Sequence, residues 1–369
     1  MSSDSMMAVV TLGNGGYDKL DYTSVPRPVP GEGEVLLRVL AAGCNNTDVN
    51  LRLGWYSKSV QGATSETAQA MDGEHKDDSG WDGKNPFPII QGCDACCRVV
   101  GVGQGVGDGL LGRRCLIRPC QRTKGFGSLD SVWMGSNING AFAQFVVAPV
   151  SEVFPVECAW SDAELGSIPC AYGTAEGMLI KASLTPGDHV LVPGASGGVG
   201  SAVVQLSKIR GAKVTAIVGS ESKVELVRRI GADEVIVSRH GQGGWEEAMA
   251  SLRGTVNVVV DNVGGPGFPD LIDCLARSGR YVTSGAISGP IVALDLRTLY
   301  LMDLTFLGST TWEEATMPNL VKYIEAGQLK PVVAATFPLS DIVSAQEQFL
   351  TKKHVGKIVL IPDPVPGEA

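Results

Sequence analysis

The sequence predicts an α/β protein in which a nucleotide-binding unit of alternating strands and helices is inserted into a second, mostly β unit. Three observations lead to this prediction. A glycine-dense turn, Gly194–Gly200, lies between an apolar strand-like run and a run with helical periodicity. Strand and helix patterns then alternate through Gly308, whereas short β-like runs broken by Gly and Pro precede this block. A last strand-like run, Lys357–Ile361, follows the block, so the block lies between two parts of the other unit.

The glycine-dense turn is the strongest single indication of function. His189–Pro193 is rich in Val and Leu and predicts a strand, and the run through Val203, Val204 and Leu206 has the period of a helix. Such a turn brings bare backbone N–H groups to a helix N-terminus, where the helix dipole favours a pyrophosphate. The residues expected to bind the nucleotide here are Ala195, Ser196, Gly197, Gly198, Val199 and Gly200.

The segments after the turn continue a βαβαβ pattern. A strand is predicted at Lys213–Val218, a helix at Glu221–Ile230 and a further strand at Glu234–Ser238. This order predicts a doubly wound parallel sheet. The remaining expected elements are strands at Val256–Val260, Arg280–Ser284 and Leu304–Leu307 and helices around Pro269–Ala276, Met317–Ala326 and Ile342–Leu350.

The part before the turn has the character of a small, closed β structure. Short alternating runs with frequent Gly and Pro occur in Met7–Val39, Phe87–Val102, Gly112–Pro119 and Gly140–Pro149. One or two helices are predicted in Trp160–Met178. The polar segment Ser57–Asn85 has no clear periodicity and predicts a surface insertion, either a solvated loop or a lid over a site.

Length and composition restrict the class of protein. A chain of 369 residues predicts two domains, and 44% hydrophobic with 19% charged residues is ordinary globular composition. No apolar run is long enough to cross a membrane, and the N-terminus lacks the features of a secretion signal. The formal charge of −9 and the lack of basic runs argue against nucleic acid as a partner. Nine irregularly spaced cysteines predict reduced thiols and a cytoplasmic protein.

Several segments, in this order along the chain, resemble the medium-chain dehydrogenase/reductases. They are EVLLRVLAAG, the pair Gly92 and Asp94, GAFAQFVVAP, GASGGVG, VVDNVGG, SGAISGP and HVGKIVL. The resemblance implies a GroES-like catalytic domain built from residues 1–171, with the polar insertion 57–85, and from residues 308–369. A Rossmann domain at residues 172–307 would lie between these parts, with the active site in the cleft. It also implies a homodimer joined through the sheet edge around Leu294–Leu307.

The metal ligands of the family are only partly retained. Zinc alcohol dehydrogenases of this family have a Cys at the position of Asn45, a His-Glu pair at Cys93-Asp94 and a second Cys at Cys170. Asn is a poor zinc ligand, whereas Cys93, Asp94 and Cys170 could each coordinate. Because two positions depart from the pattern, the sequence does not favour catalytic zinc, and a Cys93/Asp94/Cys170 site stays open as the alternative. The four cysteines of a structural zinc site are also missing.

The zinc-free branch of the family matches better. The run from Asn45 through Asp48 to Tyr56 resembles the N-x-x-D-x-N-x-x-x-G-x-Y pattern of enoyl reductases and quinone oxidoreductases. The resemblance implies that Tyr56 donates a proton, with Asn45, Asp48 and Asp94 as further active-site residues. A phenol with an ordinary pKa near ~10 is protonated at neutral pH and can supply the proton that follows hydride addition. Tyr56 packed in the cleft wall beside Trp55 is the alternative interpretation.

The second strand of the nucleotide-binding unit predicts which nicotinamide is used. NAD-binding Rossmann folds carry an acid at the end of this strand, and here Gly219 takes that place. Ser220, Lys223 and Arg239 could instead hold a 2′-phosphate, so NADPH is expected in preference to NADH. Glu221 is the contrary observation, because an acid shifted by two residues could still reach the ribose.

Further cofactor contacts and the overall function follow from the resemblance. Its implied cofactor-binding residues are Thr174, Asn262, Gly285, Ala286, Ile287 and Lys357. The leading hypothesis is a zinc-independent, NADPH-dependent reductase of an activated C=C bond, a quinone or a related carbonyl of a small molecule. A zinc alcohol dehydrogenase is the second hypothesis. The third is a protein that binds the cofactor but has a non-redox or structural role. The sequence does not name the substrate.

Overall fold

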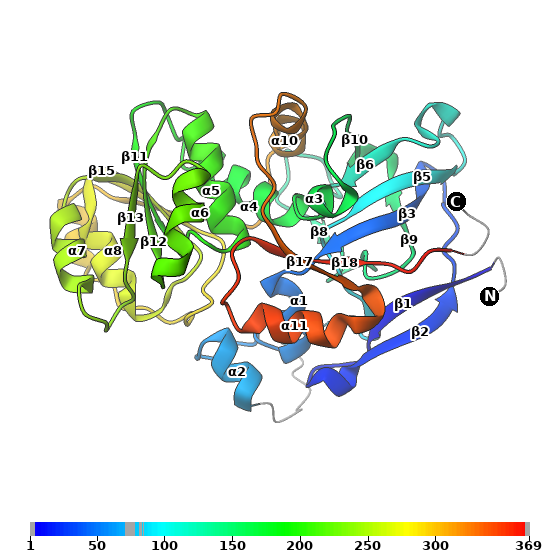
Figure 1. Ribbon diagram of the computed structural model, residues 1–369, viewed down its shortest axis with the longest axis horizontal. Coiled ribbons are helices and arrows are strands. Elements are labelled where there is room, and N and C mark those ends of the chain that lie inside the picture. Colours follow the sequence, from blue (N-terminus) through cyan, green and yellow to red (C-terminus); the bar gives the residue numbers. More distant parts are fainter. Residues whose placement is uncertain (1–3, 71–77, 81–82, 84, 366–369) are drawn as a thin grey trace.

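The computed structural model describes residues 4–70, 78–80, 83 and 85–365. Two lobes lie side by side, and helix α4 (Pro169–Lys181) lies between them (Figure 1). One lobe is the Rossmann unit. The other, the GroES-like unit, contains both the blue N-terminal strands and the red C-terminal segment. Of the predicted insertion, residues 71–77, 81, 82 and 84 lie outside the described part of the chain.

The Rossmann unit contains the predicted parallel sheet, with six strands in the order β13-β12-β11-β14-β15-β16. Their bounds are β11 (His189–Pro193), β12 (Lys213–Val218), β13 (Glu234–Val237), β14 (Val256–Asp261), β15 (Leu275–Thr283) and β16 (Thr305–Gly308). The strand order reverses between β11 and β14, and crevices at such a switch point receive nucleotides. The glycine turn directly follows β11, so the topology places it at this edge.

Helices connect these parallel strands. They are α5 (Gly198–Ile209), α6 (Val224–Arg229), α7 (Trp245–Leu252), α8 (Phe268–Asp273) and α9 (Leu296–Leu301). Several boundaries differ from the prediction, and the helix expected around Pro269–Ala276 ends at Asp273. The segment Glu221–Lys223 is a separate 3-10 turn before α6. Strand β15 begins at Leu275 rather than Arg280, because the buried Leu275 already pairs with Val256.

The GroES-like unit is built from sheets that are antiparallel except for the parallel pair β17 and β18, and the tail completes it. Strands β17 (Val333–Pro338) and β18 (Lys357–Ile361) join its seven-stranded sheet, where Val359 of β18 faces Gly43 of β3 (Glu34–Gly43). The other strands of this sheet are β5 (Cys96–Val102), β6 (Arg114–Ile117), β9 (Phe145–Pro149) and β10 (Val153–Pro155). Smaller sheets contain β1 (Ser5–Thr11), β2 (Leu20–Pro26) and β4 (Ile89–Ile90), and β7 (Cys120–Gln121) with β8 (Val132–Trp133).

Five helices accompany these sheets: α1 (Asn46–Leu53), α2 (Thr64–Ala70), α3 (Asp162–Gly166), α10 (Thr316–Glu325) and α11 (Ile342–Leu350). Helix α2 lies within the polar insertion and was not predicted. Only Thr64 among its residues is buried, so its sequence lacks the apolar face that marks most surface helices.

Helix α4 links the two units through their shared core. Its residues Tyr172, Ala175 and Met178 are buried in the same hydrophobic cluster as strands of the Rossmann sheet and as Trp312. A Cβ at Gly173 would collide with the Trp312 ring, so the indole can lie against α4 only because this position is glycine. The buried contacts of α4 explain why both lobes hold a defined position at the cleft.

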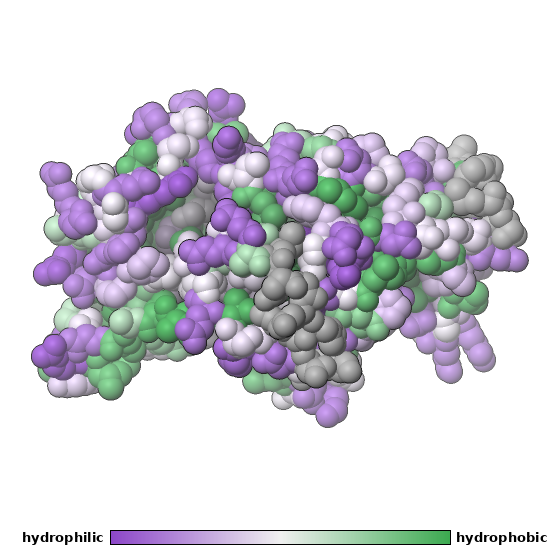
Figure 2. Space-filling view, turned by 90° about the horizontal axis from the view of Figure 1, so that it is seen from below, coloured by the Kyte–Doolittle hydropathy of each residue, from purple (hydrophilic) through white to green (hydrophobic). Residues whose placement is uncertain are grey.

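The surface and the thiols are consistent with a globular chain. Hydrophilic residues predominate on the face in Figure 2, with hydrophobic residues gathered in several places, including the margin at the Rossmann end. Within the described ranges, no helix combines the length and apolar character needed to span a bilayer. All nine cysteines are free thiols.

Candidate active site

The glycine turn is the expected binding site for the cofactor phosphates. Helix α5 begins at Gly198, and the first amides of a helix have no partners inside it. A Cβ at Gly200 would collide with the Gly194 carbonyl oxygen, and a Cβ at Gly198 would lie 2.7 Å from Cδ of Lys357. Glycine at these positions keeps the turn tight, and a pyrophosphate at the amides that begin α5 stays a prediction.

A positive charge lies at the place where NAD-binding Rossmann folds carry an acid. Strand β12 ends at Val218, and a Cβ at Gly219 would lie 2.7 Å from Nη2 and 2.8 Å from Cζ of Arg239. The exposed Arg239 guanidinium thus covers Gly219. Ser220 follows, with its hydroxyl 3.0 Å from that of Ser222. A guanidinium beside a hydroxyl fits a phosphate monoester, because both donate hydrogen bonds to phosphate oxygens.

Lys223, also expected to hold the 2′-phosphate, is oriented differently from a solvated surface lysine. It is 7% exposed, and its Nζ donates a hydrogen bond to the carbonyl oxygen of Lys352 at 2.7 Å. Burial and then the nearby Arg239 lower the pKa of Lys223. Glu221, the acid that could have favoured NADH, is exposed. The cations of this end of the cleft therefore lie near one another.

The centre of the cleft holds a buried polar cluster around Asp94 and Lys357. Nζ of Lys357 lies 2.8 Å from Oδ2 of Asp94, and their side chains are 4% and 0% exposed. The ammonium also donates to the Cys44 carbonyl oxygen at 2.8 Å and to Oδ1 of Asn45. Burial lowers the pKa of Lys357 and the Asp94 carboxylate raises it, with a net shift upward. The ammonium is therefore charged and fully bonded within the protein.

The rest of the Asp94 carboxylate is also bonded. Nδ2 of Asn45 donates to Oδ2 at 2.8 Å, and the backbone N–H of Cys170 donates to Oδ1 at 2.5 Å. Gly43 makes room for the ion pair, because a Cβ there would lie 2.5 Å from Oδ2 of Asp94 and 3.0 Å from Cε of Lys357. The cluster thus joins the GroES-like loop before β5, the start of α1, the start of α4 and the last strand.

The same residues do not fit a metal ion as they lie. The thiols of Cys93 and Cys170 are hydrogen bonded to each other, which, with burial, raises the pKa of Cys93 well above its usual value. Asn45 donates its amide toward Cys93, with 3.4 Å between Nδ2 and Sγ. Catalytic zinc needs three deprotonated or neutral ligands around an open position, but here an ammonium lies against the Asp94 carboxylate. Over the described ranges, no three His, Cys, Asp or Glu side chains are arranged to hold a metal.

Tyr56 lies at the same site. Its hydroxyl donates to Oγ1 of Thr47 at 3.2 Å, and its ring packs edge-on against Trp55 with centroids 5.7 Å apart. Burial is the main reason that the pKa of Tyr56 is raised, and Cys93 and Cys170 are among the groups close enough to contribute. The phenol is consequently a neutral acid beside the polar cluster.

Asp48 was expected in the active site, and its carboxylate makes a hydrogen bond that stabilises the start of a helix. Its Oδ2 accepts the backbone N–H of Asn45 at 2.8 Å, which caps the start of α1. Burial raises the pKa of Asp48 to about 7, despite this hydrogen bond. The carboxylate is 2% exposed, so it positions Asn45 and Thr47 through the helix rather than facing open space.

Several of the residues expected around the nicotinamide contact one another in the Rossmann unit. Oδ1 of Asn262 accepts the hydroxyl of Ser284 at 2.5 Å, and the Asn262 carbonyl accepts the N–H of Ile287 at 3.4 Å. Gly285 and Ala286 lie between these two contacts along the chain. Thr174 follows Cys170 by one turn of α4 and is half-buried on the same face. The contacts thus link Asn262 to the loop Gly285–Ile287, whereas Thr174 lies on the Cys170 face of α4.

Two residues that the sequence did not single out complete the cleft. The N–H of Thr64 donates to the Ile287 carbonyl at 3.0 Å, and its hydroxyl donates to Oδ1 of Asn50 at 3.0 Å. The start of the insertion therefore bridges the two units. Lys352 reaches α1 from the tail, with Nζ 2.9 Å from Oδ1 of Asn46. The sequence signal that could have pointed to Lys352 is the run Lys352, Lys353 and His354, which lies close to Lys357 in an acidic chain.

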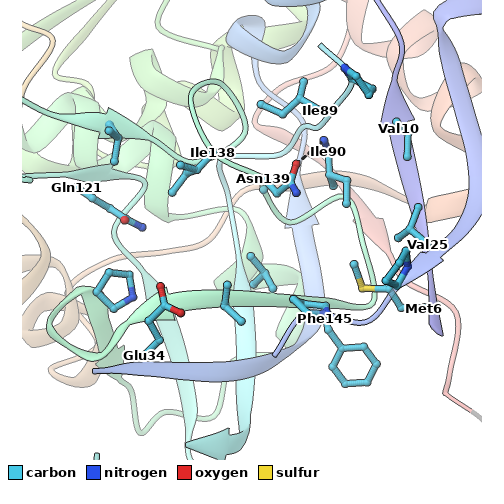
Figure 3. Close-up of a pocket in the computed structure, with 18 residues that line it drawn as sticks. Met6, Val10, Val25, Glu34, Ile89, Ile90, Gln121, Ile138, Asn139 and Phe145 are labelled. Carbon is cyan, nitrogen blue, oxygen red and sulfur yellow. Dashed lines mark hydrogen bonds between the residues drawn. The ribbon is translucent and has the colours of Figure 1, made fainter. Parts of the chain in front are cut away.

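A separate cavity of about 570 Å³ lies within the GroES-like unit (Figure 3). It is lined mainly by apolar side chains of β1, β2, β4 and β9, with Asn139 bonded to the N–H of Ile90 at 3.0 Å. None of its lining residues belongs to the polar cluster or the glycine turn. Gln121, Ile138 and Asn139 also line this cavity.

Comparison with known proteins identifies two matching family models. Residues 31–158 match the model described as an alcohol dehydrogenase GroES-like domain. Residues 198–326 match the model described as a zinc-binding dehydrogenase. The two matches fall on the GroES-like and Rossmann units.

Individual relatives span nearly the whole chain. A crystal structure named a "putative alcohol dehydrogenase", from Sinorhizobium meliloti 1021, is 40% identical with a TM-score of 0.87, covering 98% of this chain and 97% of that one. An acryloyl-coenzyme A reductase of Metallosphaera sedula is 29% identical, over 96% of this chain and 99% of the relative. A quinone oxidoreductase of Mus musculus is 27% identical, over 96% and 98%.

The buried ion pair yields a stability prediction. Lys357→Met should lower the free energy of unfolding by about 3–5 kcal/mol, because it leaves the Asp94 charge buried without a counter-ion. Adding Asp94→Asn keeps an acceptor for the Cys170 N–H but removes the charge, so the double variant should recover much of the loss. Urea unfolding of the wild type, the two single variants and the double variant measures the coupling energy between Lys357 and Asp94. Strictly additive effects of the two substitutions would contradict the ion pair.

Proposed function

The chain belongs to the medium-chain dehydrogenase/reductase family and is an NAD(P)H-dependent oxidoreductase; we propose that it uses NADPH, without zinc, to reduce an activated C=C bond. An enone, a quinone or an enoyl thioester is the proposed substrate class. The acryloyl-coenzyme A reductase and the quinone oxidoreductase among its relatives support this class.

The observation that carries the proposal is the Lys357 ammonium bonded to Asp94 and Asn45. A metal site in this family would need the Asp94 region and the thiols of Cys93 and Cys170 as ligands. The lysine already supplies the positive charge that balances Asp94, so a divalent cation would meet repulsion and an occupied carboxylate. The site therefore favours a reaction that needs a proton donor rather than a Lewis acid.

NADPH is proposed because the region expected to bind the adenosine ribose, at the end of β12, is cationic. Arg239 covers Gly219, at the position where NAD-binding Rossmann folds carry the acid that accepts the ribose hydroxyls. The glycine turn provides amides for the pyrophosphate, and Asn262 with the loop Gly285–Ile287 provides a wall for the nicotinamide. When bound, the cofactor supplies the hydride.

The chain's own residues would supply the proton and exclude water. Hydride addition to the β-carbon leaves enolate charge on the carbonyl oxygen, and Tyr56 would deliver the proton that the product needs. The Thr47 hydroxyl, which accepts from Tyr56, holds the phenol in place. The contact of Thr64 with Ile287 closes the insertion against the Rossmann loop, which would keep water from the reacting carbon.

An alcohol dehydrogenase activity is the second candidate, and the name of the Sinorhizobium meliloti relative favours it. It would require Cys93, Asp94 and Cys170 to release their present partners and bind zinc. A cofactor-binding protein with a non-redox role is the third. Such a protein would bind NADPH without consuming it when offered enones, quinones and aldehydes.

A homodimer is proposed from the surface of the Rossmann unit. Strand β16 is an edge strand of the sheet, and exposed apolar side chains cluster near it: Ile291, Val292, Leu296, Tyr300 and Leu301. Pairing two β16 edges would cover these side chains. Light scattering should give twice the chain mass for the wild type, and Leu301→Lys should shift the mass toward one chain. A wild-type mass of one chain would contradict the proposal.

Replacement of Tyr56 tests the proton donor. Tyr56→Phe should lower kcat for an enone or enoyl thioester by roughly 10²–10⁴-fold, because the proton donor is lost while the ring still packs on Trp55. The affinity for NADPH and the urea midpoint should stay at wild-type values. Tyr300→Phe, an exposed tyrosine on α9, is the matched control. Wild-type kcat in Tyr56→Phe would remove Tyr56 from the mechanism.

Replacement of Arg239 tests the cofactor preference. Arg239→Gln should weaken NADPH binding by roughly tenfold to a hundredfold, since a charged hydrogen bond to the 2′-phosphate contributes about 1.5–3 kcal/mol. NADH binding should hardly change, because NADH lacks this phosphate. Fluorescence titration measures both, with Arg229→Gln as a surface control. Equal losses for the two cofactors would contradict a 2′-phosphate site at Arg239.

A further inference from the structure

A row of cations runs along the cleft from the end of β12 to the polar cluster. Lys223 lies near Arg239 and donates to the Lys352 carbonyl. Lys352 in turn lies near Lys223 and Lys357. Of these four cations, only Lys357 forms an ion pair among the residues that the structure describes. In a chain of formal charge −9, three neighbouring cations without acids indicate a site for an anion.

Lys352 occupies a specific place in this row. It follows helix α11 with a φ of +53°, in the left-handed region, so the chain turns sharply there. Its Nζ donates to Oδ1 of Asn46 and lies 3.6 Å from the centroid of the Phe349 ring. Asn46 is the first residue of α1, the helix that also carries Thr47. The ammonium is thus held between the tail and the catalytic helix.

The segment after Lys352 lies directly on the glycine turn. The N–H of Gly356 donates to the Ser196 carbonyl at 2.9 Å, and the Lys357 stem lies against Gly198. Between Lys352 and Gly356 in the chain, His354 packs its ring against that of Phe349, with centroids 5.7 Å apart. The segment that carries Lys352 is therefore held on the nucleotide-binding turn.

We propose that Lys352, held by Asn46, binds the pyrophosphate of the dinucleotide and so couples cofactor binding to the catalytic helix α1. This assignment rests on the proposed function, because it takes the bound dinucleotide as given. Arg239 lies where the ribose 2′-phosphate is proposed to bind, and Tyr56 lies where the substrate is proposed to react. Lys352 lies between these two residues in the row of cations. The middle of an extended NADPH is its pyrophosphate. Lys352 would face it from the side opposite the amides of the glycine turn.

The coupling has a direct structural basis. Asn46 and Thr47 are consecutive, and Thr47 accepts the Tyr56 hydroxyl. A phosphate that holds Lys352 therefore also holds the start of α1, and with it the partner of the proton donor. Coenzyme A also contains a pyrophosphate, and an enoyl thioester substrate could present it. The contact between Gly356 and Ser196 favours the dinucleotide, because it places the Lys352 segment on the nucleotide-binding turn.

Small fragments separate the two phosphate sites. ADP contains the pyrophosphate without a 2′-phosphate, whereas adenosine 2′-monophosphate contains the 2′-phosphate alone. Calorimetric titration of Lys352→Met should show ADP and NADPH binding weakened by roughly tenfold to a hundredfold, with adenosine 2′-monophosphate unaffected. Arg239→Gln should show the reverse selectivity with the fragments. Lys353→Met, at the adjacent exposed lysine, is the matched control and should bind all three as the wild type does.

The pH dependence of ADP binding provides a second readout. Burial, then Lys357 and Lys223, lower the pKa of Lys352 to about 7 in the free protein. A bound phosphate favours the protonated lysine, so ADP affinity should be highest below pH 7 and should fall as pH rises toward 9. His354, with its pKa lowered to about 4 by burial and these lysines, stays neutral in this range. Lys357 remains charged beside Asp94, and the depressed pKa of Lys223 adds to the wild-type slope.

Lys352→Arg is the rescuing variant. It keeps the positive charge at all accessible pH values, so it should bind ADP nearly as the wild type does at pH 6.5 and lose less affinity at pH 9. Wild-type ADP affinity in Lys352→Met would overturn the proposal. So would a loss confined to coenzyme A binding in the NADPH-saturated protein, which would assign the lysine to the substrate. Equal affinity for NADPH and NADH would instead contradict the cofactor preference, and the ADP result would still stand.

Discussion

The ion pair between Lys357 and Asp94 is the interaction on which the rest of the active site depends. It is buried, and it joins the last strand of the chain to a loop that precedes β5. Asn45 and the N–H of Cys170 bond to the same carboxylate, so the starts of α1 and α4 are held by it as well. Two buried charges are costly unless fully paired, and here each has hydrogen-bond partners beyond the other. Gly43 provides the space that this arrangement needs.

The cluster is also the basis of the proposal that this site works without zinc. An ammonium is a fixed positive charge that cannot accept an electron pair, so it balances Asp94 without activating a carbonyl oxygen. In the proposed reaction, the cofactor supplies the hydride and the buried phenol supplies the proton. The tail that supplies Lys357 also supplies Lys352 and lies on the glycine turn. One short segment of chain, from Lys352 to Lys357, therefore contacts both the glycine turn and helix α1.

Local patterns were enough to predict much of the fold but only part of the site. The glycine turn, the βαβ order and the strand Lys357–Ile361 follow from periodicity and from Gly positions, which report on neighbouring residues. Helix α2 was missed because it has almost no buried face. The position of Arg239 over Gly219, and the pairing of Lys357 with Asp94, join residues far apart in sequence. No local pattern specifies such contacts. The resemblance implies that Lys357 contacts the cofactor, and this stays a prediction: its ammonium bonds within the protein, while its stem lies against Gly198.

The central claim is that this site works without a metal, and one measurement tests it most directly. Purified protein is analysed for zinc, and NADPH-dependent reduction of an enone or an enoyl thioester is measured before and after treatment with a strong chelator. The account predicts far less than one zinc atom per chain and a rate that the chelator leaves unchanged. About one zinc per chain, with activity lost on chelation and restored by zinc, would contradict it and establish a metal-assisted dehydrogenase.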